Sequence, residues 1–404
     1  MANKKNEDPI LKTYKESVKL LKKLETTRGF VASSESVVNY RRVFSRDGVI
    51  SGLAALTTGN KKLINTFKQT LITLRDTQHE TGRIASNVPV RGNQLGYGVS
   101  YGTSVGRVDA TLWYVLGVCQ YILKTGQKGE FKLFKDSIDK ALFYLRCLEL
   151  NGRGFLYIPQ GGDWADEYIN HGYVLFDEVL YYLAMDSYLQ LVEDKKIADK
   201  KRTLKKLIQI NYFPSADSTN NKYVYDSTLF ALSLKEYQPP MPIACFTGHS
   251  VHYRVDTFAI SLLLLSDILN PKEKEILGTE VLNKCLPKDF PILPAFYPVI
   301  EKDDHDWPHL INNYRFKFRN KPHEYHNGGL WPLVHGFFLS SYKNKKSKEY
   351  LEDFAKILSR DKYTFAEFYS GKTYKAGGTR NLGFSASAYV LAYNAILKNK
   401  KPFK

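Results

Sequence analysis

The lengths of the connections between helices limit most strongly how this chain of 404 residues can fold. Apolar residues recur with helical spacing in about twelve segments. These segments are 9–24, 48–58, 61–77, 108–125, 130–149, 172–193, 197–209, 256–268, 272–285, 329–342, 346–360 and 383–398. Short connections such as "TGNK" and "LNPK" alternate with long ones, and the long ones are 78–107, 150–171, 210–255, 286–328 and 361–382.

A short turn joins two helices into an antiparallel hairpin. If such hairpins pack side by side, every long connection emerges on the same face, and long ordered connections are usually functional. About six hairpins in a ring, with the first helix paired to the last, form an (α/α)6 barrel. We therefore expect an all-α fold, an (α/α)6 barrel with long loops on one face. No linker rich in Pro, Gly or Ser interrupts the chain, so we expect one domain over residues 1–404.

The formal net charge of +17 raises the question of an anionic partner. The lysines fall at helix ends and turns, such as 193–206, 343–350 and the C-terminal "KNKKPFK", with few aromatic residues among them. A nucleic acid would need rings on which its bases could stack. We therefore expect dispersed, solvated lysines, and neither a nucleic-acid partner nor a membrane partner.

The four cysteines, Cys119, Cys147, Cys245 and Cys285, are widely spaced and form no C-x-x-C pair. This pattern predicts reduced thiols and a cytoplasmic protein. The N-terminal residues lack an apolar signal core. No apolar run reaches the roughly 18 residues that a membrane helix needs. Homo-oligomer formation is compatible with the sequence, which does not specify it.

Polar and aromatic residues gather in five clusters at the edges of the long connections. The clusters are Arg46 and Asp47; Arg107, Asp109 and Trp113; Asp163, Trp164, Asp166, Glu167 and His171; His326, Asn327 and Trp331; and Glu367, Tyr369, Lys372 and Arg380. By the hairpin argument all five converge on one face. Carboxylates, amides and rings without metal-ligand spacing suit a neutral polyhydroxylated ligand such as a sugar.

Several of these residues also have a structural interpretation. Asp109 can cap a helix, Arg46 can pair locally with Asp47, and Asp163 and Asp166 can be turn or cap residues.

The stretch "EYHNGGLWP" gives two further expectations. We expect Asn327 to cap the helix that follows, while Gly328 and Gly329 let the backbone approach a ligand. Glu367 differs from the other candidates because it lies in a loop between aromatic residues, with no capping role. Such surroundings tend to raise the pKa of a carboxyl group.

Metal and cofactor chemistry have no sequence support. His171, His326 and His335 lack the spacing of metal ligands. No Walker, nucleophile-elbow or dinucleotide-binding glycine pattern is present. We therefore expect no metal and no cofactor.

The segments "VFSRD", "GRVDATLWY", "EYHNGGLWP" and "AEFYSGKTYKAGGTRNLGFSASAYVLA" resemble, in order and spacing, the alkaline/neutral invertases. Those enzymes belong to a wider clan of six-hairpin glycosidases with amylo-α-1,6-glucosidase and mannosylglycerate hydrolase types. The likeness spans roughly residues 40–395. Two features depart from the invertase pattern: Tyr114 stands where a second tryptophan is usual, and "GGDWADEYINHGYVLFDEVLYY" looks more like the debranching and glucosylglycerate branches.

The resemblance implies an inverting glycoside hydrolase acting on an α-glucoside or a sucrose-like small saccharide. Asp109 matches the general acid of the clan, and Glu367 matches its general base. The other matching positions are implied substrate contacts, and they are Arg46, Asp47, Trp113, Trp164, Asp166, His171, His326, Asn327, Trp331 and Arg380.

Four alternatives stay open. The first is a non-catalytic carbohydrate-binding protein on the same barrel, which need not keep both carboxyl groups. The second is a glucosylglycerate- or mannosylglycerate-type hydrolase. The third is a protein that binds nucleic acid or an anionic surface, which would require the positive charge to cluster on one face. The fourth is an epimerase or lyase, in which His171 or His326 would serve as the acid or base.

Overall fold

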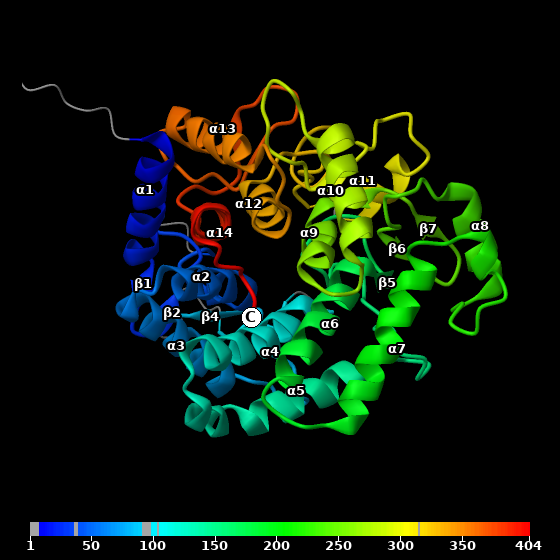
Figure 1. Ribbon diagram of the computed structural model, residues 1–404, viewed down its shortest axis with the longest axis horizontal. Coiled ribbons are helices and arrows are strands. Elements are labelled where there is room, and N and C mark those ends of the chain that lie inside the picture. The colour runs from blue at the N-terminus through cyan, green and yellow to red at the C-terminus, as the bar shows by residue number, and fades with distance from the viewer. Residues whose placement is uncertain (1–7, 36–38, 91–97, 103–104, 314–315) are drawn as a thin grey trace, which may run out of the picture.

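A computed structural model of the protein describes residues 8–35, 39–90, 98–102, 105–313 and 316–404. Helices form a ring in two layers (Figure 1). Within the described ranges, each inner helix packs against the next, and the last packs against the first. The inner helices are, in ring order, α2 (Ser45–Thr58), α4 (Val108–Thr125), α6 (Leu175–Leu189), α9 (Thr257–Leu265), α12 (Pro332–Ser341) and α14 (Gly383–Lys398).

The outer layer consists of helices that alternate with the inner ones along the chain and lie around them (Figure 1). They are α1 (Pro9–Lys23), α3 (Lys61–Asp76), α5 (Lys135–Cys147), α7 (Lys195–Asn211), α10 (Pro271–Cys285) and α13 (Ser347–Arg360). Short turns join α2 to α3, α4 to α5, α6 to α7, α9 to α10 and α12 to α13. The expected (α/α)6 barrel is confirmed.

The two layers follow from the distribution of apolar residues. An inner helix is covered on all sides, so it can be apolar all round. In α9, "TFAISLLLL", every residue from Thr257 to Leu264 is buried. An outer helix buries one stripe, and in α13 that stripe includes Leu351, Phe354 and Leu358. The remaining surface of α13 carries lysine and glutamate, which keeps the outside of the ring polar.

The first and last helices close the ring, as the sequence predicts. The rings of Tyr14 on α1 and Tyr393 on α14 stack with centroids 4.2 Å apart. The Tyr389 hydroxyl donates to the Ile10 carbonyl over 3.1 Å. On the other side of α14, the Asn394 amide donates to Thr57 Oγ1 of α2 over 3.0 Å.

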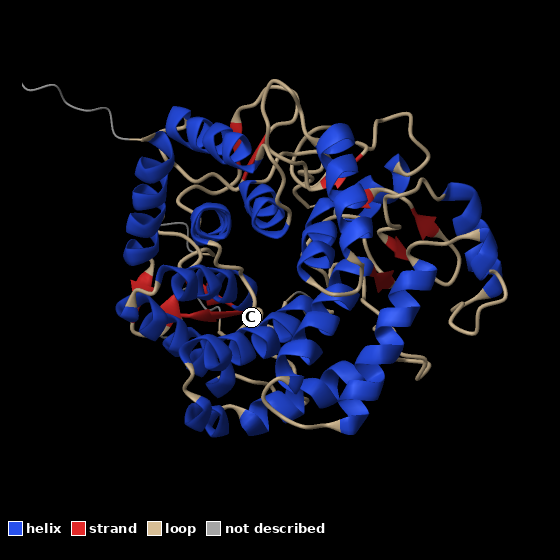
Figure 2. Ribbon diagram, in the orientation of Figure 1, coloured by secondary structure: helices blue, strands red, loops and turns tan. Residues whose placement is uncertain are grey.

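Short antiparallel strands lie in the connections between helices (Figure 2). The pairs are β1 (Glu25–Thr26) with β2 (Gly29–Phe30); β3 (Arg42–Phe44) with β4 (Asn87–Pro89); β5 (Tyr173–Val174) with β6 (Cys245–Phe246) and β6 with β7 (Val251–His252); β8 (Val255–Asp256) with β9 (Phe296–Tyr297); and β10 (Phe368–Tyr369) with β11 (Ala376–Gly377). Because β3, β5 and β8 run directly into α2, α6 and α9, these pairings fix where three inner helices begin.

The long connections also hold helices that the sequence analysis did not anticipate. They are α8 (Ser227–Glu236), α11 (Trp307–Asn313) and the short 3-10 helix Ala216–Ser218. A second 3-10 helix, Lys128–Leu133, lies in the short turn between α4 and α5. No helix in the described ranges is both long enough and apolar enough to cross a bilayer.

Candidate active site

The starts of the inner helices meet at one end of the ring, which we call the front. Arg46 in the first turn of α2 reaches Asp109 in the first turn of α4, with 2.7 Å between Nη1 and Oδ2. Trp164, from the connection before α6, donates to Asp256 at the start of α9 over 3.0 Å. The hairpin argument is therefore correct in bringing the ends of the long connections together. The opposite end, where the short turns lie, is the rear.

Asp109 is a buried carboxylate with an arginine partner. It is 1% exposed and lies inside α4, whose N-cap is Arg107, so it does not cap the helix. Arg46 pairs with Asp109 and not with its neighbour in the sequence, Asp47. Burial raises the pKa of Asp47 to about 6, against the lowering effect of Arg46. Asp47, Asp109 and Asp166 thus all act on the Arg46 guanidinium, so this arginine lies among three carboxyl groups.

Glu367 is another buried carboxyl at the front, and it is 4% exposed. Its Oε2 accepts from the Thr379 backbone amide over 2.9 Å, and its Oε1 accepts from the Tyr40 hydroxyl over 3.2 Å. Burial raises the pKa of Glu367, while Thr379, Arg319 and Tyr40 act in the opposite direction. The carboxyl is therefore held in place by two donors and stays able to take up a proton.

Because Gly378 has no side chain, the Glu367 carboxyl can occupy the space beside it. Its φ is +71°, and a Cβ atom there would lie 2.2 Å from Glu367 Oε2. Only glycine tolerates both this backbone conformation and this close approach.

A second set of ion pairs borders the same region. Arg319 Nε donates to Glu167 Oε2 over 3.0 Å, and its guanidinium lies 3.8 Å above the centre of the Tyr325 ring. Arg107 pairs with Asp166. Arg319 is also among the charges that act on Glu367, so this set adjoins the proposed base.

Aromatic rings surround His326, which is 1% exposed. The His326 ring stacks on Trp331 with centroids 5.0 Å apart and meets Trp164 edge-on at 5.2 Å. Burial lowers the pKa of His326, and the positive charges of Arg319, Arg46 and Arg107 add to that effect. His326 is therefore neutral at pH 7, and its Nδ1 has no hydrogen-bond partner among the described residues.

Several sequence candidates have other positions or roles. Trp113 is fully buried against Phe258 and Phe337, so it packs the interior of the ring. The expectation that Asn327 caps α12 is wrong, because its side chain bonds the backbone of Ile300. Its Oδ1 accepts from the Ile300 N–H over 2.8 Å, and its Nδ2 donates to the Ile300 carbonyl over 2.9 Å.

Three other candidates have different contacts. His171 lies beside Ile169 and His252, and Arg380 is exposed. Asp163 is a buried turn residue whose oxygens accept from the Ala165 amide and from Asn170, and burial, followed by the charges of Asp256 and Asp109, raises its pKa.

Sequence reasoning missed four residues at the front, which are Tyr40, Asp256, Arg319 and Tyr325. A signal for Asp256 was present, because Arg254-Val255-Asp256 repeats the pattern Arg107-Val108-Asp109 at the start of another inner helix. Tyr40 and Arg319 meet their partners across long separations in the chain, and no local pattern reveals such contacts.

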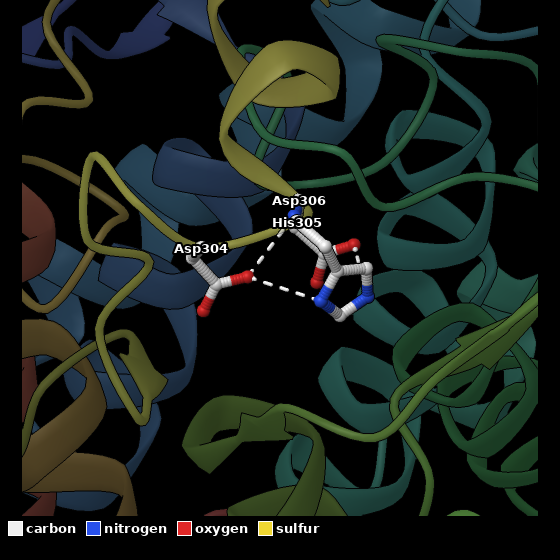
Figure 3. Close-up of side chains that lie close together, drawn as sticks. All are labelled: Asp304, His305 and Asp306. Carbon is white, nitrogen blue, oxygen red and sulfur yellow. Dashed lines mark hydrogen bonds and ion pairs between the residues drawn. The ribbon is translucent and has the colours of Figure 1, made fainter.

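One group of side chains in the described ranges could hold a metal ion: Asp304, His305 and Asp306, whose ligand atoms lie within 4.8 Å of one another (Figure 3). Both carboxylates pair with Arg254, which is buried, while His305 is largely exposed. The arginine already supplies the positive charge that a metal would bring. We therefore interpret the group as a clamp that fixes this connection next to the start of α9.

The sequence of the chain is similar to those of known invertases. A family model described as alkaline and neutral invertase matches residues 12–233. Cytosolic invertase 1 of Oryza sativa subsp. japonica is 23% identical over 367 residues, covering 77% of this chain and 62% of that protein. Probable alkaline/neutral invertase A, chloroplastic, of Arabidopsis thaliana is 24% identical over 347 residues, covering 73% and 54%. The chain thus spans less than two thirds of the length of these relatives.

Solved structures share the fold at low sequence identity. A glycosidase variant in complex with glucose has a TM-score of 0.61 at 11% identity, covering 97% of this chain and 98% of its own. A bacterial glucoamylase complexed with acarbose has a TM-score of 0.64 at 15% identity, covering 96% and 56%. A family 63 mannosylglycerate hydrolase from Thermus thermophilus has a TM-score of 0.63 at 12% identity, covering 94% and 99%.

Proposed function

Because the chain belongs to the alkaline and neutral invertase family, we propose that it is an inverting glycoside hydrolase acting on an α-glucoside or a sucrose-like small saccharide. The observation that carries this proposal is the presence of two buried carboxyl groups at the front of the ring, Asp109 and Glu367. Asp47 influences the protonation of Glu367 and is itself influenced by Asp109, so the three groups share one electrostatic environment.

In this mechanism Asp109 is the general acid and Glu367 is the general base. Asp109 protonates the leaving oxygen while Glu367 takes a proton from a water molecule that attacks the opposite face of the sugar. One displacement then inverts the anomeric carbon, with the carboxyl groups ~6.5–9.5 Å apart to leave room for the water. Burial favours the neutral form of Glu367, and its donors Thr379 and Tyr40 favour the ionised form that a base requires.

The ion pair between Arg46 and Asp109 must break during the catalytic cycle. Asp109 cannot donate a proton while it is an ionised partner of Arg46. We propose that Asp109 is protonated in the substrate complex and that Arg46 then pairs with Asp47, the next carboxyl that acts on it. Arg46 would in this way prevent loss of the proton to Asp47.

The remaining contacts are assigned by position. We propose that the neutral ring of His326 bonds a sugar hydroxyl through its unpartnered Nδ1, and that Trp164 and Trp331 form the apolar wall behind it. Arg46, Asp47 and Asp166 complete the proposed set. We leave Trp113, Asn327, His171 and Arg380 outside it, because each has the other role or position described above.

The charges favour a neutral substrate over a sugar acid. Near Asp109 and Glu367, three arginines (Arg46, Arg107 and Arg319) face five carboxyl groups (Asp47, Asp109, Asp166, Glu167 and Glu367), and Arg254 at the start of α9 faces two more, Asp304 and Asp306. An anionic substrate such as a glucosylglycerate or mannosylglycerate would add a further negative charge to this excess. The sugar-acid hydrolase therefore remains the second candidate, supported by the shared fold alone.

The deciding experiment incubates the purified protein with sucrose, isomaltose, trehalose, glucosylglycerate and limit dextrin and follows the products by NMR. We expect turnover of a neutral α-glucoside with β-glucose as the first anomer. Retention of configuration would contradict the mechanism. Binding of a sugar without turnover of any member of the panel would instead support the non-catalytic alternative.

Two further parts of the proposal concern the whole chain. We propose that residues 1–404 act as one catalytic domain, supported by the way α1 and α14 close the ring together. We also propose a cytoplasmic location, supported by four cysteines that are all free thiols. Of the two relatives, one is named cytosolic and the other chloroplastic, so fractionation of the source cells is the test.

A further inference from the structure

The rear of the ring is tied together by the last residues of the chain. After α14 the segment 399–404 runs across the ends of neighbouring inner helices. Lys400 Nζ donates to the Thr57 carbonyl of α2 over 3.1 Å, and Lys404 Nζ donates to the Leu123 carbonyl of α4 over 3.0 Å. Lys343, in the turn after α12, donates to Asn399 Oδ1 over 3.0 Å. Four segments that are distant in the sequence therefore form one continuous surface.

We call this the rear basic surface, and it comprises residues 55–64, 122–138, 338–350 and 395–404. These 50 residues hold 14 lysines, no arginine and 3 acidic residues, and so contribute +11 of the net charge of +17. The other 354 residues contribute only +6. The sequence-based expectation of dispersed lysines is therefore wrong, because the fold that gathers the long loops at the front also gathers the short turns at the rear.

Helix capping does not account for this charge. Lysines near a helix C-terminus are favourable, and Lys400 and Lys404 fit that explanation. The starts of the outer helices are different, because a positive charge there opposes the helix dipole. Lys61 and Lys62 nevertheless begin α3, Lys135 begins α5, and Lys346 and Lys348 lie at the start of α13.

Carboxylates do not neutralise the surface either. Of its 14 lysines, Lys62 and Lys135 form ion pairs within the described ranges. Two of its acidic residues, Glu130 and Asp136, are already paired with lysines outside it. Burial, with the charges of Lys400 and Lys404, lowers the pKa of Lys124 to about 8, which shows how closely these groups crowd one another. The surface is thus short of negative charge.

The residue types distinguish between anionic partners. Nucleic acids are commonly read by arginine forks and stacked on exposed rings, whereas this surface has no arginine and its aromatic residues are at least partly buried. Its exposed large apolar residues are aliphatic, namely Leu133 at 44% and Leu397 at 39% exposure. Clustered lysines beside aliphatic side chains match the headgroup layer of an anionic bilayer.

We propose that the rear basic surface docks the protein on an anionic lipid surface, with the front of the ring directed away from the lipid. Binding is peripheral. It rests on many electrostatic interactions between lysines and lipid phosphates and not on one pocket. This orientation leaves the proposed active site open to sugars in the surrounding water. The proposal does not depend on which glycoside is cleaved.

The test measures co-sedimentation of the full chain with vesicles of phosphatidylcholine alone and of phosphatidylcholine mixed two to one with phosphatidylglycerol. We expect binding to the mixed vesicles only, with loss of binding at about 0.5 M salt because the charges are screened. The rear variant combines Lys345→Gln, Lys346→Gln, Lys348→Gln and Lys401→Gln, since these four side chains make no hydrogen bond within the described part of the chain. It should partition ~10²–10³-fold more weakly, at roughly a fivefold loss for each of the four lysines removed.

A matched variant removes the same number of charges elsewhere. Lys288→Gln, Lys302→Gln, Lys321→Gln and Lys375→Gln lie in long connections at the front and are exposed. This control should bind the mixed vesicles like the parent, and both variants should keep the parent melting temperature. Equal binding by the rear variant and the control would overturn the proposal, as would absence of binding to mixed vesicles. Lysine-dependent binding of duplex DNA or RNA without lipid binding would assign the surface to nucleic acid instead.

Discussion

The two ends of the ring are built from the same helices and differ in how they treat charge. At the front, Arg46, Arg107 and Arg319 are each matched by carboxyl groups, and both sides of each pair are largely withdrawn from water, as with Arg46 and Asp109. At the rear, lysines outnumber acidic residues and most stay exposed. Long connections have enough chain to fold over charged side chains and bury them, whereas short turns leave them in solvent. The same ring of helices can therefore serve a separate purpose at each end.

The largest expected effect is at the front. Asp109→Asn should lower kcat by ~10²–10⁴-fold, because an amide cannot supply the proton of a general acid. Asn is close to Asp in size, so sugar binding measured by calorimetry should change little. Asp186→Asn, on α6 near the rear, is the control and should keep full activity. An Asp109→Asn enzyme with more than about a tenth of the parent rate would contradict the assignment.

A pair of glycines separates backbone strain from damage to the site. Gly378 at the front and Gly59 at the rear both have φ near +71°, but a Cβ atom at Gly59 meets nothing within 4 Å. Both alanine variants should lose roughly 1 kcal/mol of stability from strain. Only Gly378→Ala should also displace Glu367 and reduce kcat, by ~10²-fold for a shift near 1 Å. Equal activities of the two variants would show that the position of Glu367 does not matter.

The buried carboxyls at the front should make stability depend on pH. The pKa of Asp47 is about 6 in the folded protein and 3.8 as its ordinary value, so the folded state binds more protons between these values. The free energy of unfolding should therefore fall as the pH rises from about 4 to 6, by about 3 kcal/mol from this residue. Asp47→Asn should remove that part of the fall in urea titrations. A parent whose stability rises over this range would contradict the burial argument.

The smallest effect concerns the hydroxyl of Tyr40. Burial raises the pKa of Glu367, and the Tyr40 hydroxyl opposes this by donating to the carboxylate. Tyr40→Phe should raise the pKa of Glu367 further and move the acidic limb of the pH–rate profile to higher pH. Loss of one hydrogen bond to a charged group should also lower kcat/KM by ~10-fold or somewhat more. Tyr101→Phe, whose hydroxyl bonds the Thr77 carbonyl, is the control and should leave the limb in place.

The fold was predictable because connection lengths record which helices are neighbours. The two proposed catalytic carboxyls stand in local motifs, so the sequence could nominate them. Tyr40 and Arg319 could not be found in this way, since their partners lie far along the chain and only folding brings them together. Asn327 was misjudged because a local capping pattern competed with a distant backbone, that of Ile300, and the distant contact is the one formed. The lysines were expected to be dispersed because each short turn was considered separately. The hairpin argument already placed those turns together at one end of the ring.

The pairing of α1 with α14 has a consequence for how the molecule is made. The apolar flanks of α2 and α12 are covered by α14, which is synthesised after the other helices of the ring. Until residues 383–398 are synthesised, the nascent chain is an open arc with two unpartnered apolar edges, a form prone to aggregate. Maturation should therefore be late and all-or-none, and a ribosome stalled before α14 should hold a chain that chaperones bind and proteases cut.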